Sequence, residues 1–535
     1  MMKCKSYFGW FLITVLLVIG IERTAIRAEA ADNQPVLLVY DSKNVAEHGD
    51  LSLDRCQRLL TSFGLRARTV QLSQYHQHML KTGRYQGVIT MVNWAQSRSQ
   101  NQAFEQDRAR FNGIKLHIGP NLQADERTGL GGTFKTLTHQ QLNLHQGRAR
   151  QPLSANKTLL VNDRRTDGTQ SIGWLTSQTQ PATLYSYGVV VGQAGFLPEL
   201  GKDGLSMTLA GQLLARLFRR PSWVHRPMLT ITGITPYTRL DHLQHLIDQL
   251  AARGFPFALS IVSVAQNTNL KAFHRYTKVL RSVEKAGGLI FWSPATEIGT
   301  QRLNETELRS VFQIELASLG ADRVIPVGVS AAGYWNRSVR RQRAVLNQAT
   351  HVLMLPDQPQ KLEQPSAEPE AAVTTSQQFD TGIVGIPFKA FETATFRGKI
   401  KFTQPTALLV NMPAGQREIN DLMQQLQTSN FKWFDPVQDQ LKTTLKTAAT
   451  SYGYRAGQYL FNGEPITDLD AGMTEFSDSH QRVVKTSWMN QIIQWQSQAL
   501  LWLFAGIGLL LAGLLIVGRH IYRGKFIHSH MNKDR

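Results

Sequence analysis

Short apolar runs alternate with amphipathic helical stripes along most of the chain, and this alternation constrains the fold more than any other feature. "PVLLVY" (35–40) precedes apolar residues at i, i+3, i+4 and i+7 in 56–63. "MLTITGI" (228–234) precedes a similar stripe in 240–250. This spacing predicts helices, and the short apolar runs predict buried strands. Because alternating strands and helices pack as a parallel sheet or barrel, we predict an α/β protein.

The first alternating region covers residues 31–150. Further strands are expected at 67–72, 87–92 and 114–119. This order fits a parallel sheet with covering helices, flavodoxin-like in outline. From 151 to 220 the pattern mixes strand-like runs with one helical stripe, which predicts a β-rich connector followed by a helix.

A second alternating region covers residues 221–463. Its strand-like runs include "FALSIV" (257–262) and "LIFWS" (289–293), followed by "RVIPVGVS", "HVLMLP" and "TALLVNMP". Repeated units of this length predict a (β/α) barrel, with its chemistry at the carboxyl ends of the strands. The stretch 357–378 is rich in Pro, Glu, Gln and Ser, so we predict a mobile surface insertion there.

An apolar run near the N-terminus predicts export. Residues 8–21 are apolar, Lys3 and Lys5 precede them, and small residues follow. This order predicts a secretory signal peptide over residues 1–30. Cys56 is then the only cysteine outside the signal, which excludes an intramolecular disulfide and fits a bacterial envelope protein.

A longer apolar run near the C-terminus predicts a membrane anchor. Residues 499–518 contain no charged side chain and are long enough for a transmembrane helix. The basic tail at 519–535 is expected in the cytoplasm by the positive-inside rule. We predict a single-pass membrane protein, with a stalk at 464–498 and residues 31–498 outside the cell.

The chain is strongly basic. Its net charge is +19, and most of the excess lies between the two apolar segments. A basic surface attracts anionic envelope polymers, lipid head groups or extracellular nucleic acid. We expect no specific nucleic-acid recognition. A basic soluble face without such a partner is the alternative.

Two short motifs in the first region suggest chemistry that their contexts do not support. A glutamine amidotransferase needs a nucleophilic cysteine after a strand, but Asn93 and Trp94 follow the third predicted strand, and Cys56 lies on an apolar stripe. "GLGGTFKT" (129–136) is similar to a phosphate loop, but Phe134 stands where a glycine lets the backbone approach phosphate. We interpret Cys56 as a packing residue and 129–136 as a surface loop.

"MLTITGITPYTRLDHLQHLIDQLAARGFPFALSIVSV" (228–264) resembles the opening of the polysaccharide-deacetylase superfamily. The layout, with "GFLPELGKDGLS" (195–206) and a terminal anchor, resembles a branch of membrane-anchored secreted proteins found near bacterial exopolysaccharide genes. The resemblance in layout extends over most of the outward-facing chain. It implies a deacetylase-like barrel.

The catalytic motifs of that family are changed in this chain. In the family, paired aspartates supply a base and a metal ligand, and two histidines complete a site for a divalent metal that activates water. The resemblance places Thr232 and Gly233 at the aspartate positions, and Trp292 and Thr296 at the histidine positions. Threonine is a poor neutral ligand, and glycine and tryptophan offer no lone pair. We predict no metal, no cofactor and no deacetylation there.

The same changes favour a saccharide-binding cleft. Aromatic faces stack on sugar rings, and threonine hydroxyls bond to sugar hydroxyls. The candidate ligand-binding residues are Thr232, Thr235, Tyr237, Trp292 and Trp335. Alternatively, the aromatic side chains fill the space left by the metal and its ligands.

Other polar side chains are candidates for a catalytic site that would replace the lost one. These candidates are Asp241, His242, His245, His274 and Glu297. His242 and His245 fit the polar face of an ordinary helix equally well. An active carbohydrate hydrolase that uses Asp241 or Glu297 is therefore the second hypothesis.

The leading hypothesis is a non-catalytic envelope protein that binds polysaccharide or scaffolds its assembly. The link to exopolysaccharide is implied by the family resemblance. The expected partners are envelope polysaccharide or another anionic polymer, the membrane, and membrane proteins of polysaccharide synthesis. A membrane protein-interaction module without a glycan role is the third hypothesis.

Overall fold

The computed structural model divides into two compact units, Met1–Ala471 and Gly472–Arg535, and each is described by itself. The residues that it describes are 34–41, 51–92, 101–153, 158–164, 167–179, 181–221, 223–294, 303–357, 374–375, 378–467, 504, 507, 510–511 and 513–519.

The first unit begins with a twelve-stranded mixed sheet. Its order is β17-β2-β1-β3-β4-β11-β10-β9-β6-β7, with β5 and β8 paired beside β10. Neighbours from β2 to β11 are parallel, and those from β11 to β7 are antiparallel. Strands from the predicted connector thus continue the sheet of the first region. The strands are β1 (Val36–Tyr40), β2 (Ala67–Gln71), β3 (Gly87–Met91), β4 (Ile114–Ile118), β5 (Thr133–Thr138), β6 (Leu142–Gln146), β7 (Ala149–Pro152), β8 (Thr158–Arg164), β9 (Gln170–Ser177), β10 (Leu184–Val191), β11 (Ala194–Leu197) and β17 (Thr374–Thr375).

Helices cover both faces of this sheet because its parallel strands are apolar on both faces. In β1, Val36 and Leu38 belong to the main core, whereas Leu37 and Val39 belong to a second core that includes Phe104. This alternation follows the two-residue period of a strand. The helices are α2 (Ser52–Ser62), η3 (Leu72–Gln74), α3 (Met79–Thr82), α4 (Gln102–Arg110), α5 (Ala124–Leu130) and α6 (Gly204–Leu217).

The second part of this unit is a closed barrel of parallel strands in the order β12-β13-β14-β15-β16-β18-β19. This confirms the predicted α/β class and the barrel. Its strands are β12 (Met228–Ile234), β13 (Ala258–Val262), β14 (Leu289–Ser293), β15 (Gly328–Ala332), β16 (His351–Leu355), β18 (Thr381–Pro387) and β19 (Thr406–Asn411). Its helices are α7 (Leu240–Ala252), α8 (Lys271–Lys285), α9 (Glu305–Ala321), η5 (Gly333–Arg337), α10 (Val339–Ala344), η6 (Leu346–Gln348), η7 (Phe388–Phe391), η8 (Arg397–Lys399) and α11 (Gln416–Ser429).

A small antiparallel sheet packs beside the barrel, near the start of β14 and of β16. Its strands pair in sequence order and are β20 (Lys442–Lys446), β21 (Ser451–Arg455), β22 (Gln458–Phe461) and β23 (Glu464–Pro465). The Tyr459 hydroxyl donates to the carbonyl of Gly288 (2.7 Å), and the Tyr452 hydroxyl donates to that of Leu316 (2.9 Å). These bonds join the small sheet to the segment before β14 and to α9.

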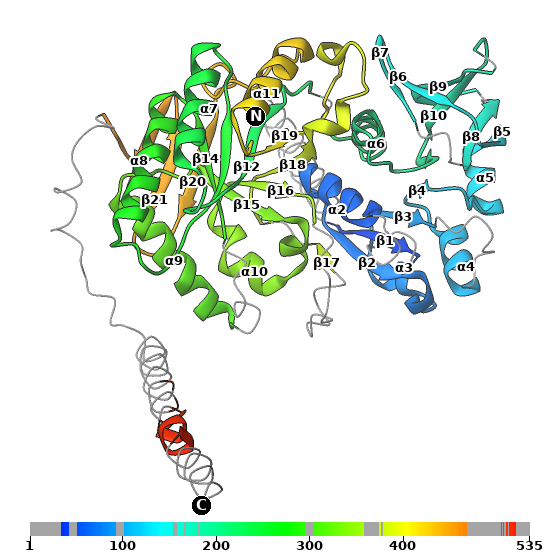
Figure 1. Ribbon diagram of the computed structural model, residues 1–535. Helices are drawn as coiled ribbons and strands as arrows, with labels where there is room; N and C mark the ends of the chain where they lie inside the picture. The colour runs from blue at the N-terminus through cyan, green and yellow to red at the C-terminus, as the bar shows by residue number, and fades with distance from the viewer. Residues whose placement is uncertain are drawn as a thin grey trace, which may run out of the picture. The chain divides into compact units, whose positions relative to one another are not determined.

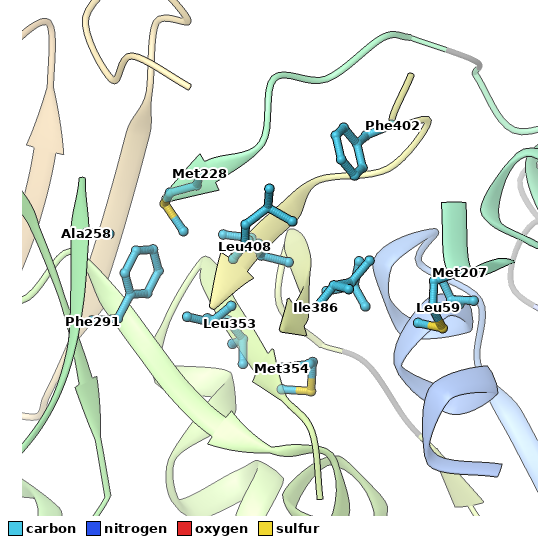
Figure 2. Close-up of a cluster of buried hydrophobic side chains, with 14 of the residues drawn as sticks. Leu59, Met207, Met228, Ala258, Phe291, Leu353, Met354, Ile386, Phe402 and Leu408 are labelled. Carbon is cyan, nitrogen blue, oxygen red and sulfur yellow. The ribbon is translucent and has the colours of Figure 1, made fainter. Parts of the chain in front are cut away.

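The barrel and the N-terminal sheet share one hydrophobic core. Helix α2, which follows β1 in the chain, packs against the barrel strand β18 (Figure 1). Figure 2 shows Ile386 of β18 pointing toward Leu59 of α2 and Met207 of α6. Gly382 permits this close approach, because a Cβ there would lie 2.9 Å from the carbonyl oxygen of Thr61.

The connection between β16 and β18 also contacts the N-terminal sheet. Most of the predicted insertion 357–378 lies outside the described residues, but Thr374–Thr375 forms β17 and pairs antiparallel with β2. Contacts distant in sequence therefore join the sheet to the barrel, among them those through α2 and β17 and the bridge between Arg150 and Thr395.

The described residues of Gly472–Arg535 are helical. Within the described part of the chain, no helix combines the length and the apolar composition needed to cross a bilayer. The predicted signal peptide (1–30) lies outside the described residues, as do most of the predicted stalk (464–498) and tail (519–535) and half of the predicted transmembrane helix (499–518).

Candidate functional site

A cavity of about 1290 Å³ lies at the carboxyl ends of the barrel strands. We call it the large cavity. The strand register shows which side chains point into it, because paired residues on parallel strands share a face. Ser260 of β13 pairs with Phe291 of β14, and Val262 pairs with Ser293. Ser260, Val262 and Ser293 accordingly line the cavity.

Small hydroxyl side chains contribute to the lining of the large cavity. The Ser260 and Ser330 hydroxyl oxygens lie 2.8 Å apart in a hydrogen bond across the barrel. Ser263 also lines the cavity, and its buried hydroxyl has no hydrogen-bond partner among the described residues. A buried polar group without a partner is costly unless a water or ligand bonds to it. The cavity is therefore suited to a polar occupant.

Thr232 and Gly233 lie at the mouth of the large cavity, as the sequence predicts, and their local structure is a β-bulge. The register of β12 against β13 shifts between Ile231 and Ile234. Gly233 has φ +79°, in the left-handed region that glycine adopts most easily. The Thr232 hydroxyl donates to Oδ1 of Asn411 at 3.0 Å. Gly233 is thus required by the bulge itself.

The loop after β12 brings Thr235 and Tyr237 to the same mouth. The Thr235 hydroxyl accepts from the backbone N–H of Tyr237 (3.2 Å), while the Thr235 N–H donates to the Thr238 hydroxyl (2.9 Å). These bonds fix a tight turn that presents the Tyr237 side chain, which is 91% exposed. Of the predicted residues, Tyr237 offers the aromatic face most open to a ligand.

Trp335 also lines the large cavity, but it is only 3% exposed. The Arg341 guanidinium carbon lies 5.4 Å from the centre of the Trp335 ring and 5.0 Å from that of Tyr334. Phe312 packs against Trp335 with ring centres 5.8 Å apart. Trp335 therefore forms part of the cavity wall, whereas the half-buried Tyr334 presents more surface.

Trp292 does not line the large cavity, and we correct its predicted placement in the cleft. It is 1% exposed and pairs with Ile261, whose side chain also faces the helix layer. Its indole N–H donates to Oε2 of Glu315 on α9 at 3.1 Å, and its ring packs edge-on against Phe312. The neighbouring Ser293 is the residue of β14 that points inward at the strand end.

The residues at the predicted metal positions do not fit a divalent ion. Thr232 is bonded to Asn411, Gly233 has no side chain, and Trp292 faces α9. Thr296 lies outside the described residues. Across the described ranges, no three His, Cys, Asp or Glu side chains gather closely enough to hold a metal ion.

The candidates for a replacement site that the structure describes do not converge on the large cavity. Asp241 is exposed and pairs with Arg239 at 2.9 Å. His242 Nδ1 bonds to the carbonyl of Ala414 (2.9 Å), and His245 Nε2 lies 2.8 Å from Nε2 of Gln416. These two histidines join α7 to the segment around the start of α11.

Of the remaining two candidates, only His274 is among the described residues. His274 Nδ1 bonds to Oδ2 of Asp322 at 2.8 Å, between α8 and the end of α9. Glu297 falls outside the described residues.

Charged residues that sequence reasoning missed surround the large cavity. Asp357 follows β16 and pairs with Arg337 at 2.6 Å, and Lys389, Glu418 and Asp421 complete the charged lining. Acidic groups outnumber basic ones here, in contrast to the basic chain as a whole. Asp357 and Lys389 come just after strands, whereas Glu418 and Asp421 lie within α11, where the sequence gives no sign of a site.

A buried polar network connects this rim to α2. Asp54 Oδ2 accepts from Nε of Arg58 at 2.9 Å, and the Arg58 guanidinium also donates to the carbonyl of Gly385 in β18. Arg337 donates to Oε1 of Gln57 at 2.8 Å. Burial raises the pKa of Asp54 above its ordinary value, and the Arg58 charge opposes this rise. The network fixes α2 against the cavity wall.

Comparisons with known proteins assign no family to the chain. No protein-family model and no curated protein sequence matches it. Among solved structures, it is similar to the crystal structure of a CE4 family pseudoenzyme from Bacillus anthracis, with 10% sequence identity and a TM-score of 0.23. The match covers 39% of this chain and 63% of that chain, less than two thirds of its length. At this TM-score the similarity assigns neither fold nor function.

Proposed function

We propose that this protein is a non-catalytic, deacetylase-like envelope protein that binds polysaccharide in the large cavity. It would guide the polymer or scaffold its assembly at the cell surface. The observation that carries the proposal is the composition of the cavity lining. The exposed ring of Tyr237 lines the same cavity as the hydroxyl and amide groups of Thr232, Ser263, Ser293 and Asn411.

The chemistry of these groups favours a sugar polymer over other ligands. An aromatic ring packs on the apolar face of a sugar, while hydroxyl and amide groups satisfy its many hydroxyls. The cavity is open at the mouth, where Gly233 and Tyr237 are exposed, so a chain can extend beyond it. Among the described metal positions, Thr232 is a poor ligand and Gly233 and Trp292 supply none, which disfavours activation of water in the way the family does.

The proposed location comes from the sequence. We propose a single-pass protein of the bacterial cell membrane, with a signal peptide, the sheet and barrel outside the cell, and a basic cytoplasmic tail. The exopolysaccharide association comes from the family resemblance of 228–264. No observation on the described residues favours a hydrolase based on Asp241, because that side chain lies outside the cavity lining.

Binding of an N-acetylglucosamine oligomer to the full chain in mild detergent tests the proposal. Tyr237→Ala should weaken binding about tenfold, because a stacked aromatic contributes on the order of 1 kcal/mol beyond its buried area. Isothermal titration calorimetry measures the dissociation constant. Trp223→Ala is the matched control, because Trp223 is 73% exposed and does not line the cavity. An equal loss of affinity in both variants, or no binding across a panel of neutral, amino and acidic oligomers, would refute the proposed saccharide ligand.

A further inference from the structure

A second cavity, of about 580 Å³, lies between the loop at 394–399 and the end of α11. Its charged side chains are Arg397, Lys399 and Lys432, and none of its described lining residues is acidic. We call it the basic cavity. The charge of the basic cavity is opposite in sign to that of the large cavity's acidic rim. The two cavities therefore favour differently charged parts of a ligand.

The loop that forms one wall of the basic cavity is held in place by hydrogen bonds to its backbone carbonyls and by close packing of its glycine. The Arg397 Nε donates to the carbonyl of Ala394 at 3.1 Å, and its Nη2 donates to that of Glu392. Gly398 packs so closely on the residue after α11 that a Cβ there would lie 2.1 Å from the carbonyl oxygen of Asn430. Arg397 therefore stabilises the loop, and Lys399 and Lys432 supply the positive charge that is available to a ligand.

Phe396 is presented on this loop in an unusual conformation. Its φ is +53°, which a bulky aromatic residue rarely adopts, and its side chain is 63% exposed. Strained backbone of this kind persists where the surroundings fix it, and it gathers at binding sites. Here it presents an exposed aromatic ring on the segment that, together with Lys399, lines the basic cavity.

Lys399 and Lys432 have no ion-pair partner in the described parts of the chain, and both line the same cavity. Two unpaired ammonium groups that line one cavity favour an anion there. An adjacent aromatic ring favours a ligand with an apolar face. We propose that the basic cavity binds an acidic sugar residue, with its carboxylate between the lysines and its ring against Phe396.

The arrangement along α11 favours a polymer as the occupant. Asp421 and Gln425 of this helix line the large cavity, while Thr428 and Ser429 line the basic cavity. A helix of 14 residues is roughly 21 Å long, so one extended chain can lie along it and reach both sites. The choice of a saccharide rests on the proposed function, whereas the preference for an anion rests on the basic cavity alone.

The test compares a galacturonate oligomer with a neutral galactose oligomer by calorimetry on the full chain in mild detergent. The intact protein should bind the acidic oligomer more tightly, and added salt should weaken that binding. Lys399→Gln with Lys432→Gln should weaken it about tenfold, and Phe396→Ala about fivefold. The double arginine variant, Lys399→Arg with Lys432→Arg, should retain it.

Lys271→Gln with Lys278→Gln is the matched control, because it removes two exposed charges from α8. Equal binding of both oligomers, or equal loss in the control and the basic-cavity variant, would overturn the inference. Binding to phosphatidylglycerol vesicles through Lys399 and Lys432 without galacturonate binding would overturn the saccharide class. A loss with the lysine variant but not with Tyr237→Ala would support this site and refute the ligand of the large cavity.

Discussion

Gly233 shows how a change at one residue removes a catalytic group and also shapes the strand. At φ +79° on the bulge of β12, any side chain is disfavoured by its backbone conformation. A Cβ at this position would meet nothing within 4 Å, so crowding adds no further cost. An aspartate at this position would therefore be destabilised only by its unfavourable backbone conformation.

We therefore predict that Gly233→Asp lowers the free energy of unfolding by about 1–2 kcal/mol and restores no deacetylation. Urea denaturation of the full chain measures the first effect, and acetate release measures the second. Gly233→Ala is the control, and it should cost a similar amount because it tests the backbone without the carboxylate. Unchanged stability in both variants would contradict the assigned bulge.

Glu284 is a buried acid that makes stability depend on pH. Burial raises its pKa from the ordinary 4.5 to about 8, although the Ile325 N–H donates to Oε1 at 2.6 Å. The folded state therefore keeps the proton that the unfolded state releases above pH 4.5. The contribution of this group to stability should fall as pH rises from about 4.5 to about 8, and change little beyond that.

Glu284→Gln should flatten this dependence and raise stability near pH 8, because the amide stays neutral throughout. Urea midpoints measured across this range provide the test. Glu464→Gln, an exposed acid on β23, is the control and should leave the slope unchanged. A slope that Glu284→Gln does not alter would contradict the protonated state of the buried acid.

At the scale of elements, α2 is the principal contact between the sheet and the barrel. Arg58 and Asp54 form a buried ion pair there, with side chains 4% exposed each. Arg58→Met leaves the Asp54 carboxylate buried without its partner and should cost about 3–5 kcal/mol. Adding Asp54→Leu removes the uncompensated charge, so the double variant should be more stable than the single one. Denaturant unfolding of both variants measures the difference, and a double variant no better than the single would contradict this role.

The strands of the barrel were predictable from sequence because each is a short apolar run followed by a turn residue. The contact of α2 with β18 was not, because it joins residues more than three hundred positions apart and no local pattern encodes it. Trp292 shows a second limit of prediction from the sequence. Its position at a strand end was predicted, but the face it occupies depends on the register with Ile261, which only the assembled barrel fixes.

The candidate site was predictable to a similar degree. Thr232, Gly233, Thr235 and Tyr237 belong to one continuous segment, so a single motif locates them together. Ser263, Asn411 and Asp357 reach the same cavity from separate strands, and small polar residues after a strand are too common to indicate a site. The basic cavity also joins separate segments, 394–399 and 428–432.

For the whole molecule, the central claim is that the barrel binds a saccharide in its cavity without metal chemistry. The most direct measurement incubates the full chain with an N-acetylglucosamine oligomer and zinc, then measures acetate release and the bound metal per chain. We predict oligomer binding that does not depend on zinc, no stoichiometric metal and no acetate. Zinc bound at one ion per chain, with acetate released at a rate that depends on it, would contradict the account.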